Sequence, residues 1–151
     1  MELPEYVTVE EVRRVCAKLN ISDWTQLTKA EVEPKEAEVI LKEVNVENMP
    51  IDVENFRKGL EVELEHGLAF KDANVTNNHP ILTGKIVLAH FKEMLDYYER
   101  LEVAELEGDL LKALIAGNQA KLEKYYRNLV KAKFDLSKAE LAQLERASGT
   151  K

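Results

Sequence analysis

Two glutamates and two histidines in the middle of the chain have the types and spacing of metal ligands. Glu63 and His66 are three residues apart, and His90 and Glu93 repeat the pair in reverse order. Side chains three residues apart share one face of a helix. If the two helices pack antiparallel, the reversed order brings histidine opposite histidine and glutamate opposite glutamate. Four ligands would then meet at one level, and we call them the Glu/His cluster.

The chemistry of the Glu/His cluster is that of a transition-metal site. Mixed carboxylate and imidazole ligands suit iron, manganese or zinc. Glu-x-x-His pairs that point into a helical bundle hold the metals of di-iron carboxylate proteins. The chain departs from that pattern because it has three histidines in all and one Glu-x-x-His in the usual order. Tyr97 shares the predicted face of His90, and its hydroxyl could support the cluster.

The same four residues also fit a structural role. Two histidines bonded to two carboxylates would fix the packing of the central helices without metal, because buried polar groups need partners. A catalytic acid–base pair is a third interpretation, so whether the protein is an enzyme stays open. The sequence therefore gives two main hypotheses: a small protein that binds a transition metal, or a non-enzymatic interaction or scaffold protein with a structural hydrogen-bond network.

Helix signals on either side of the cluster predict the elements that position it. Asp52 is a good N-cap for the first helix, and Gly67 is its natural stop. The apolar face of this helix is predicted to consist of Phe56, Leu60 and Leu64. Residues 68–79 form a polar, asparagine-rich loop that is long for a helical bundle. We expect this loop to be an ordered cover over the cluster, held by side-chain-to-backbone bonds. His79 is expected to be an exposed loop residue before Pro80, where the second helix begins.

The second helix is predicted to run from Pro80 through residue 101 and on toward residue 106. On a helical wheel its apolar face is defined by Ile86, Met94 and Leu101. His90, Glu93 and Tyr97 fall on the same face.

The N-terminal third predicts two further helices. Thr8 and Glu11 form a capping box that opens the first of them, which ends at Asn20. Trp24 is predicted to lie in the core. Pro34 suits the first turn of the next helix, although residues 39–46 also tolerate a strand.

Glycines and a serine divide the predicted C-terminal region, residues 102–147, into separate helices. Gly108 and Gly117 bound a short helix, and a longer one runs from residue 119 to about 133. Ser137 and Glu140 form a capping box that opens a last helix.

Length and composition predict one all-α domain over residues 1–151. The 151 residues are 45% hydrophobic and 32% charged, with six glycines and four prolines. This composition favours helices and is enough for one hydrophobic core. We expect a compact irregular bundle of five to seven helices, in which residues 56–101 form a helix–loop–helix unit.

Charge and hydropathy argue against several classes of function. The net charge of −7 opposes nucleic-acid binding, so the basic face with Lys124, Arg127 and Lys131 is interpreted as solvated. No apolar run is long enough to span a membrane, and the N-terminus lacks the pattern of a secretory signal. Cys16 is the single cysteine, which excludes an internal disulfide. The cytoplasm is the expected location, and a homo-oligomer is an open alternative.

Several short motifs between residues 56 and 101 occur together in one known family. They are ELEHG from Glu63, TGKI from Thr83, AHxxE from Ala89 and DYYxRL from Asp96. In these motifs the chain resembles a family of small prokaryotic and phage-encoded proteins of unknown function. The resemblance implies that the cluster and its loop form one unit, and it supplies no activity. His79 departs from the acidic residue expected before the proline, which makes it a poor candidate for a shared ligand.

Overall fold

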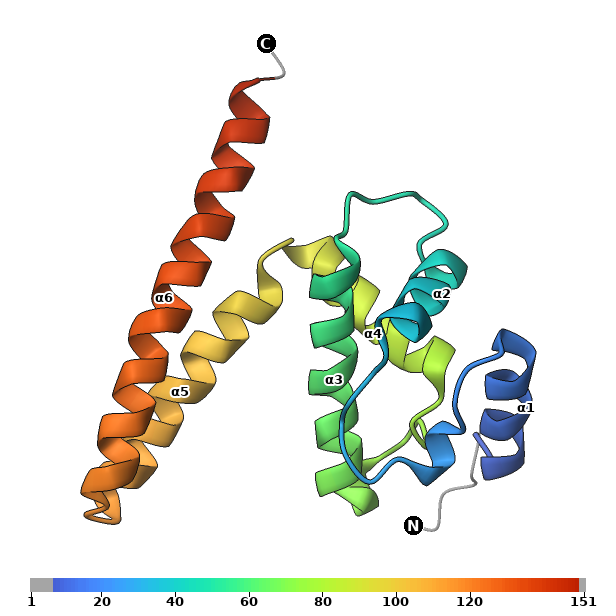
Figure 1. Cartoon of the computed structure of the whole chain (residues 1–151), viewed down its shortest axis with the longest axis horizontal. Coiled ribbons are helices and arrows are strands. Elements are labelled where there is room, and N and C mark those ends of the chain that lie inside the picture. The colour runs from blue at the N-terminus through green and yellow to red at the C-terminus, as the bar shows by residue number, and fades with distance from the viewer. Residues whose placement is uncertain (1–6, 150–151) are drawn as a thin grey trace. The chain divides into compact units, whose positions relative to one another are not determined.

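A computed structural model describes residues 7–149, which form six α-helices and two short 3-10 helices (Figure 1). No strand occurs in this part of the chain, so the all-α prediction is confirmed. The chain divides into two compact units, Met1–Glu93 and Met94–Lys151. The single domain stays a prediction. Among the described helices, none is both long and apolar enough to cross a membrane.

The first helix, α1 (Val9–Leu19), begins and ends where the sequence predicts. The Thr8 hydroxyl accepts a hydrogen bond from the Glu11 amide at 3.2 Å, as a capping residue does. Asn20 ends the helix in the left-handed conformation, with φ of 55°. The face between these caps buries Val12, Val15 and Cys16.

A buried carboxylate joins the short helix η1 (Trp24–Gln26) to α2 (Pro34–Val44). Trp24 is fully buried, as predicted, and its indole Nε1 donates to Glu36 Oε2 at 3.2 Å. The other oxygen of Glu36 accepts from the Ser22 amide at 2.7 Å. This contact between elements was not predicted. The strand alternative for residues 39–46 is wrong, because α2 continues to Val44.

Helix α3 (Val53–Ala69) confirms the predicted start but not the predicted end. The Asp52 carboxylate accepts from the amides of Glu54 and Asn55 at 2.9 and 3.2 Å. The helix does not stop at Gly67 but continues for two more residues, to Ala69. The predicted apolar face is fully buried, at Phe56, Leu60 and Leu64.

Helix α4 (Pro80–Glu93) is shorter than predicted and buries a different face. It packs on α2 and α3, and a Cβ on Gly84 would lie 2.7 Å from Ile40 Cγ2. The buried face of α4 includes Thr83 and Gly84, which carry little apolar surface. A helical wheel based on hydrophobicity therefore does not identify this face as the buried one. Ile86 and Met94, predicted to be core residues, are exposed.

The predicted helix from residue 80 to 101 is interrupted before α5 (Tyr97–Ile115). Asp96 stands at the N-cap position of α5, and its buried carboxylate accepts from Arg100 at 3.1 and 2.7 Å. The Asp96 side chain accepts no hydrogen bond from the amides of the first turn of α5, so it does not act as a capping side chain.

The second unit is an antiparallel hairpin of α5 and α6 (Gln119–Ser148), which turns at Gly117 with φ of 62° (Figure 1). The predicted breaks at Gly108 and Ser137 are wrong. Both residues lie within continuous helices, and Ser137 Oγ donates back to the Lys133 carbonyl at 2.9 Å. One glycine costs a helix about 1 kcal/mol, which packing along a long hairpin outweighs.

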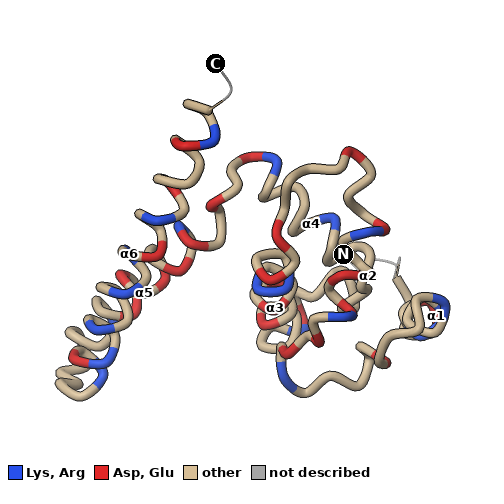
Figure 2. The backbone as a smooth tube through the Cα atoms, turned by 45° about the horizontal axis from the view of Figure 1, so that its top comes forward, with Lys and Arg blue, Asp and Glu red and all other residues tan. Residues whose placement is uncertain are grey.

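Charged residues of opposite sign lie along the two helices of the hairpin (Figure 2). Helix α5 carries five acidic and two basic side chains, and α6 carries four acidic and seven basic ones. Arg100 pairs with Glu140 at 2.8 Å, and Lys133 pairs with Glu107 at 3.0 Å. The acidic helix thus lies beside the basic one.

Candidate functional site

Glu63 and His90 of the predicted Glu/His cluster meet between α3 and α4. Glu63 Oε1 lies 3.2 Å from His90 Nδ1, and the two side chains are 16% and 26% exposed. Glu63 borders the fully buried Leu64, and His90 lies in the last turn of α4. A carboxylate and an imidazole at this distance make a close polar contact between the two helices.

The other two members of the cluster do not join this contact. His66 and Glu93 are both exposed. Within residues 7–149, no group of three or more histidine, cysteine, aspartate or glutamate side chains is placed to hold a metal ion. Glu93 points away from the contact because α4 packs through the face that contains Gly84. Glu93 lies on the opposite face of the helix and is exposed to solvent. The structure brings two of the four residues together, and their role as metal ligands stays a prediction.

Tyr97 belongs to α5 and not to the helix of His90. Its ring packs edge-on against Tyr98, with the ring centres 5.2 Å apart. Since the chain leaves helical geometry between Glu93 and Tyr97, the wheel that placed Tyr97 beside His90 does not apply. A supporting role for Tyr97 stays a prediction.

Asparagine side chains hold the loop after α3, as predicted, and its role as a cover over the Glu/His cluster stays a prediction. It contains the short helix η2 (Lys71–Ala73). Asn74 Nδ2 donates to the Gly67 carbonyl at 3.1 Å and to Asn78 Oδ1 at 2.8 Å. The amide and hydroxyl of Thr76 both donate to Asn74 Oδ1. A Cβ on Gly67 would lie 2.3 Å from Asn78 Oδ1, so only glycine fits beneath this network.

His79 is buried at 7% exposure, which corrects the prediction of an exposed loop residue. Its Nδ1 accepts from the amides of Ile81 and Leu82 at 3.2 and 3.3 Å, so the imidazole caps the N-terminus of α4. Burial lowers the pKa of His79, and the nearby carboxylate of Glu11 opposes that shift. The sequence signal for this capping role was the position of His79 directly before Pro80, the first residue of the helix.

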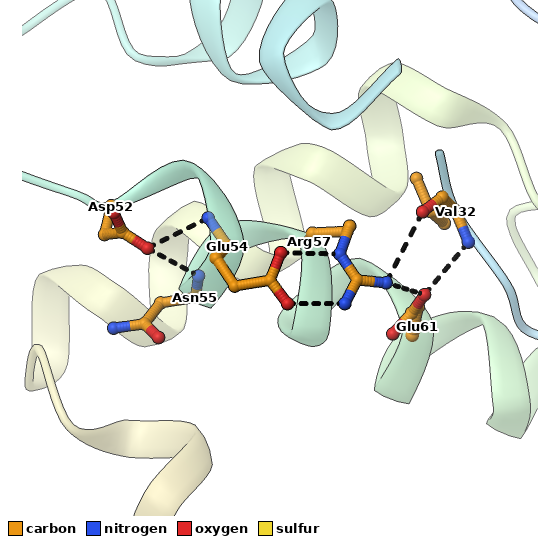
Figure 3. Close-up of polar contacts among 6 residues, drawn as sticks. All are labelled: Val32, Asp52, Glu54, Asn55, Arg57 and Glu61. Carbon is orange, nitrogen blue, oxygen red and sulfur yellow. Dashed lines mark hydrogen bonds and ion pairs between the residues drawn. The ribbon is translucent and has the colours of Figure 1, made fainter. Parts of the chain in front are cut away.

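An arginine on α3 forms a second polar cluster that the sequence reasoning missed (Figure 3). Arg57 donates to both oxygens of Glu54 and also to Glu61. Glu61 Oε1 in turn accepts from the Val32 amide at 3.0 Å, which ties the segment before α2 to α3. The hydrogen bonds with Glu54, together with the charge of Glu61, raise the pKa of Arg57. The i, i+3 and i+4 spacing of these charges was visible in the sequence.

Helix α6 has an apolar face that nothing in its hairpin covers. Leu129 and Ala132 lie on a different face of the helix and are buried. The uncovered face, which we call the α6 stripe, consists of five large side chains that are 55–66% exposed: Tyr126, Val130, Phe134, Leu141 and Leu144. At 100° per residue these five positions fall within an arc of about 80°. The stripe was missed because the prediction divided α6 at Ser137.

A comparison with known protein families matches residues 12–107 to the family described as "Protein of unknown function (DUF5661)". The matched range contains the motifs between residues 56 and 101 and extends beyond them on both sides. It ends within α5, so the whole of α6 lies outside it. No curated protein and no solved structure matches the chain.

Proposed function

The chain belongs to the DUF5661 family of proteins of unknown function, and from that premise we propose that it is a non-enzymatic interaction protein. Under this proposal it binds another polypeptide through the α6 stripe. The observation that carries the proposal is a row of five large apolar side chains on one exposed helix face, with Ser137 between Phe134 and Leu141. Exposed apolar surface gathered on one face marks interaction sites in folded proteins.

The two-faced pattern of α6 supports this proposal. A helix in a two-helix hairpin needs one apolar face, which α6 provides with Leu129 and Ala132. A second apolar face, flanked by charged residues, is typical of a helix that packs against two neighbours. The hairpin supplies only one of them.

Under the same proposal the Glu63–His90 contact is a brace between α3 and α4. Both side chains are mostly buried and each satisfies a polar atom of the other, which fits the hydrogen-bond alternative drawn from the sequence. His66 and Glu93 then remain in water and need no partner in the protein.

Transition-metal binding is the second candidate function. It is favoured by a carboxylate and an imidazole from different helices that lie 3.2 Å apart, with His66 one turn after Glu63. Iron, manganese or zinc would take Glu63 and His90 as protein ligands, with water at the remaining positions. Melting with and without metal separates this candidate from the brace.

Site-directed photo-crosslinking tests the interaction proposal. A photoreactive phenylalanine analogue replaces Phe134 in the stripe, and in a matched control it replaces Asn128, which is exposed on the opposite side of α6. Illumination of cells that express the full chain should give a discrete polypeptide adduct from position 134 and little from position 128. Equal or absent adducts at the two positions would contradict the proposal.

A further inference from the structure

We infer that the α6 stripe is covered by the α6 stripe of a second copy of this chain, packed antiparallel. The inference rests on the proposed function and identifies the partner. Three features of the stripe carry it: the register of its side chains, the charges on its two flanks, and its area.

The spacing of the stripe residues is nearly the same in both directions along α6. Its positions are 126, 130, 134, 141 and 144, and the exposed Ser137 lies on the same face. A two-fold axis beside residues 135 and 136 sets Tyr126 opposite Leu144 and Val130 opposite Leu141. The small Ser137 then faces Phe134 and leaves room for its ring. Each contact occurs twice, as a self-complementary dimer interface requires.

Charges on the two flanks of the stripe complement one another in this register. Arg127 and Glu145 are 18 residues apart, which is five full turns, so both lie on one flank. Lys133 and Glu140 lie on the other flank. Antiparallel packing about the same axis brings Arg127 toward Glu145 of the second copy, and Lys133 toward its Glu140. Both pairs join opposite charges.

Parallel packing of two α6 helices brings like charges together. In a parallel pair, residues on opposite flanks and five positions apart become neighbours. Lys133 then meets Lys138 of the second copy, and Glu140 meets its Glu145. The antiparallel register has one like-charge pair, Lys131 with Lys138, and these residues lie farther from the stripe. Within one copy Lys133 already pairs with Glu107 and Glu140 with Arg100. The charges therefore favour the antiparallel arrangement without excluding the parallel one by themselves.

The area of the stripe is sufficient for a specific dimer. Five large apolar side chains that are 55–66% exposed present roughly 500 Å² on each copy, at about 100 Å² apiece. Two stripes would bury about 1,000 Å² in total, which reaches the lower bound for a specific interface. The flanking charged residues add polar area around this apolar centre.

Oligomeric state and disulfide trapping test the inference on the purified full chain. Sedimentation equilibrium at tens of micromolar should give a mass near twice the chain's 17.2 kDa. Val130→Glu places a charge opposite Leu141 and should give a monomer with unchanged helical circular dichroism. Asn128→Glu, on the far side of α6, is the matched control and should remain a dimer.

The register is tested with cysteines at the facing positions. The double variant Val130→Cys, Leu141→Cys should form an intermolecular disulfide on mild oxidation, because each new thiol faces the other residue of the second copy. Each single variant should not, because its two thiols would be about 16 Å apart along the paired helices. A disulfide formed by either single variant would overturn the antiparallel register.

The outcomes separate the inference from the proposed function. A monomeric native chain whose position 134 crosslinks to a different polypeptide in cells would overturn the inference and leave the interaction proposal standing. A monomer without selective crosslinking at position 134 would overturn both. A dimer that persists in Val130→Glu would overturn the inference, because its interface would lie outside the α6 stripe.

Discussion

Protonation of His79 should destabilise the N-terminal unit as the pH falls from 8 to 5.5. His79 Nδ1 accepts hydrogen bonds from two amides in the first turn of α4, and it can accept them only while it carries no proton. The imidazolium would also place a positive charge at the positive end of the helix dipole. Because burial lowers the pKa of His79 in the folded protein, the unfolded chain takes up the proton first.

The direction and size of the effect follow from that difference. Stability from the neutral cap is complete above the unfolded pKa of 6.5 and is lost as the pH falls below it. While the folded state stays neutral, the free energy of unfolding decreases by at most about 1.4 kcal/mol per pH unit. At pH 5.5, one unit below the unfolded value, the loss is therefore at most about 1.4 kcal/mol.

Urea unfolding followed by Trp24 fluorescence measures this loss, because the chain has one tryptophan and it lies in the N-terminal unit. The matched variant is His79→Asn, since asparagine caps helices well and does not titrate. The charged groups that act on the pKa of His79 are Glu11 and Arg14 of α1, and both keep their charges between pH 8 and 5.5. Every other side chain is common to the native chain and the variant, so the difference between them reports position 79.

The native chain should lose more stability than His79→Asn between pH 8 and 5.5, by up to about 1.4 kcal/mol. An equal loss in the two proteins would refute the capping role of a neutral His79. A native chain that gains stability relative to the variant at low pH would show that His79 is charged in the folded state, which is the opposite of the direction expected here.

Three further predictions concern contacts within single units. Gly84→Ala should destabilise the protein by about 1–2 kcal/mol in urea, because the added methyl meets Ile40 at 2.7 Å, whereas Gly108→Ala should stabilise it by up to about 1 kcal/mol because nothing lies near that position. Glu36→Ala should lower the free energy of unfolding by about 2–4 kcal/mol, because two donors lose their acceptor. A decrease below about 0.5 kcal/mol, as expected for an exposed position, would disprove the buried contact. Zinc or manganese should leave the melting temperature unchanged if Glu63–His90 is a brace, and His90→Ala should still cost about 1 kcal/mol. A metal-induced stabilisation of about 2.7 kcal/mol at a hundred times the dissociation constant, absent in His90→Ala, would favour the metal site instead.

Local chemistry let the sequence determine most of the helix starts. Thr8 and Asp52 cap α1 and α3 through bonds to amides two or three residues away, so neither cap depends on the rest of the fold. The apolar face of α3 and the buried Trp24 were also predicted correctly. These features follow from side-chain type and helical periodicity, which adjacent residues are sufficient to specify.

Contacts between distant segments decided the candidate site. The sequence could place Glu63 and His90 on helices, but the packing of Gly84 against Ile40 set the rotation of α4 and turned Glu93 toward water. His79 likewise depends on a distant segment, because α1 contacts α4 and its Glu11 and Arg14 act on the imidazole. The pattern of apolar residues along the chain does not predict this rotation, because α4 approaches α2 at Gly84, which has no side chain.

The length of α6 and the surface it leaves uncovered also required the tertiary structure. Ser137 with Glu140 has the local pattern of a capping box, yet packing along α5 keeps the helix continuous through both. Only that continuity joins Tyr126 to Leu144 in one stripe. The capping box contributes about 1 kcal/mol, which the many contacts of a long hairpin outweigh. Those contacts exist only once the chain has folded back on itself.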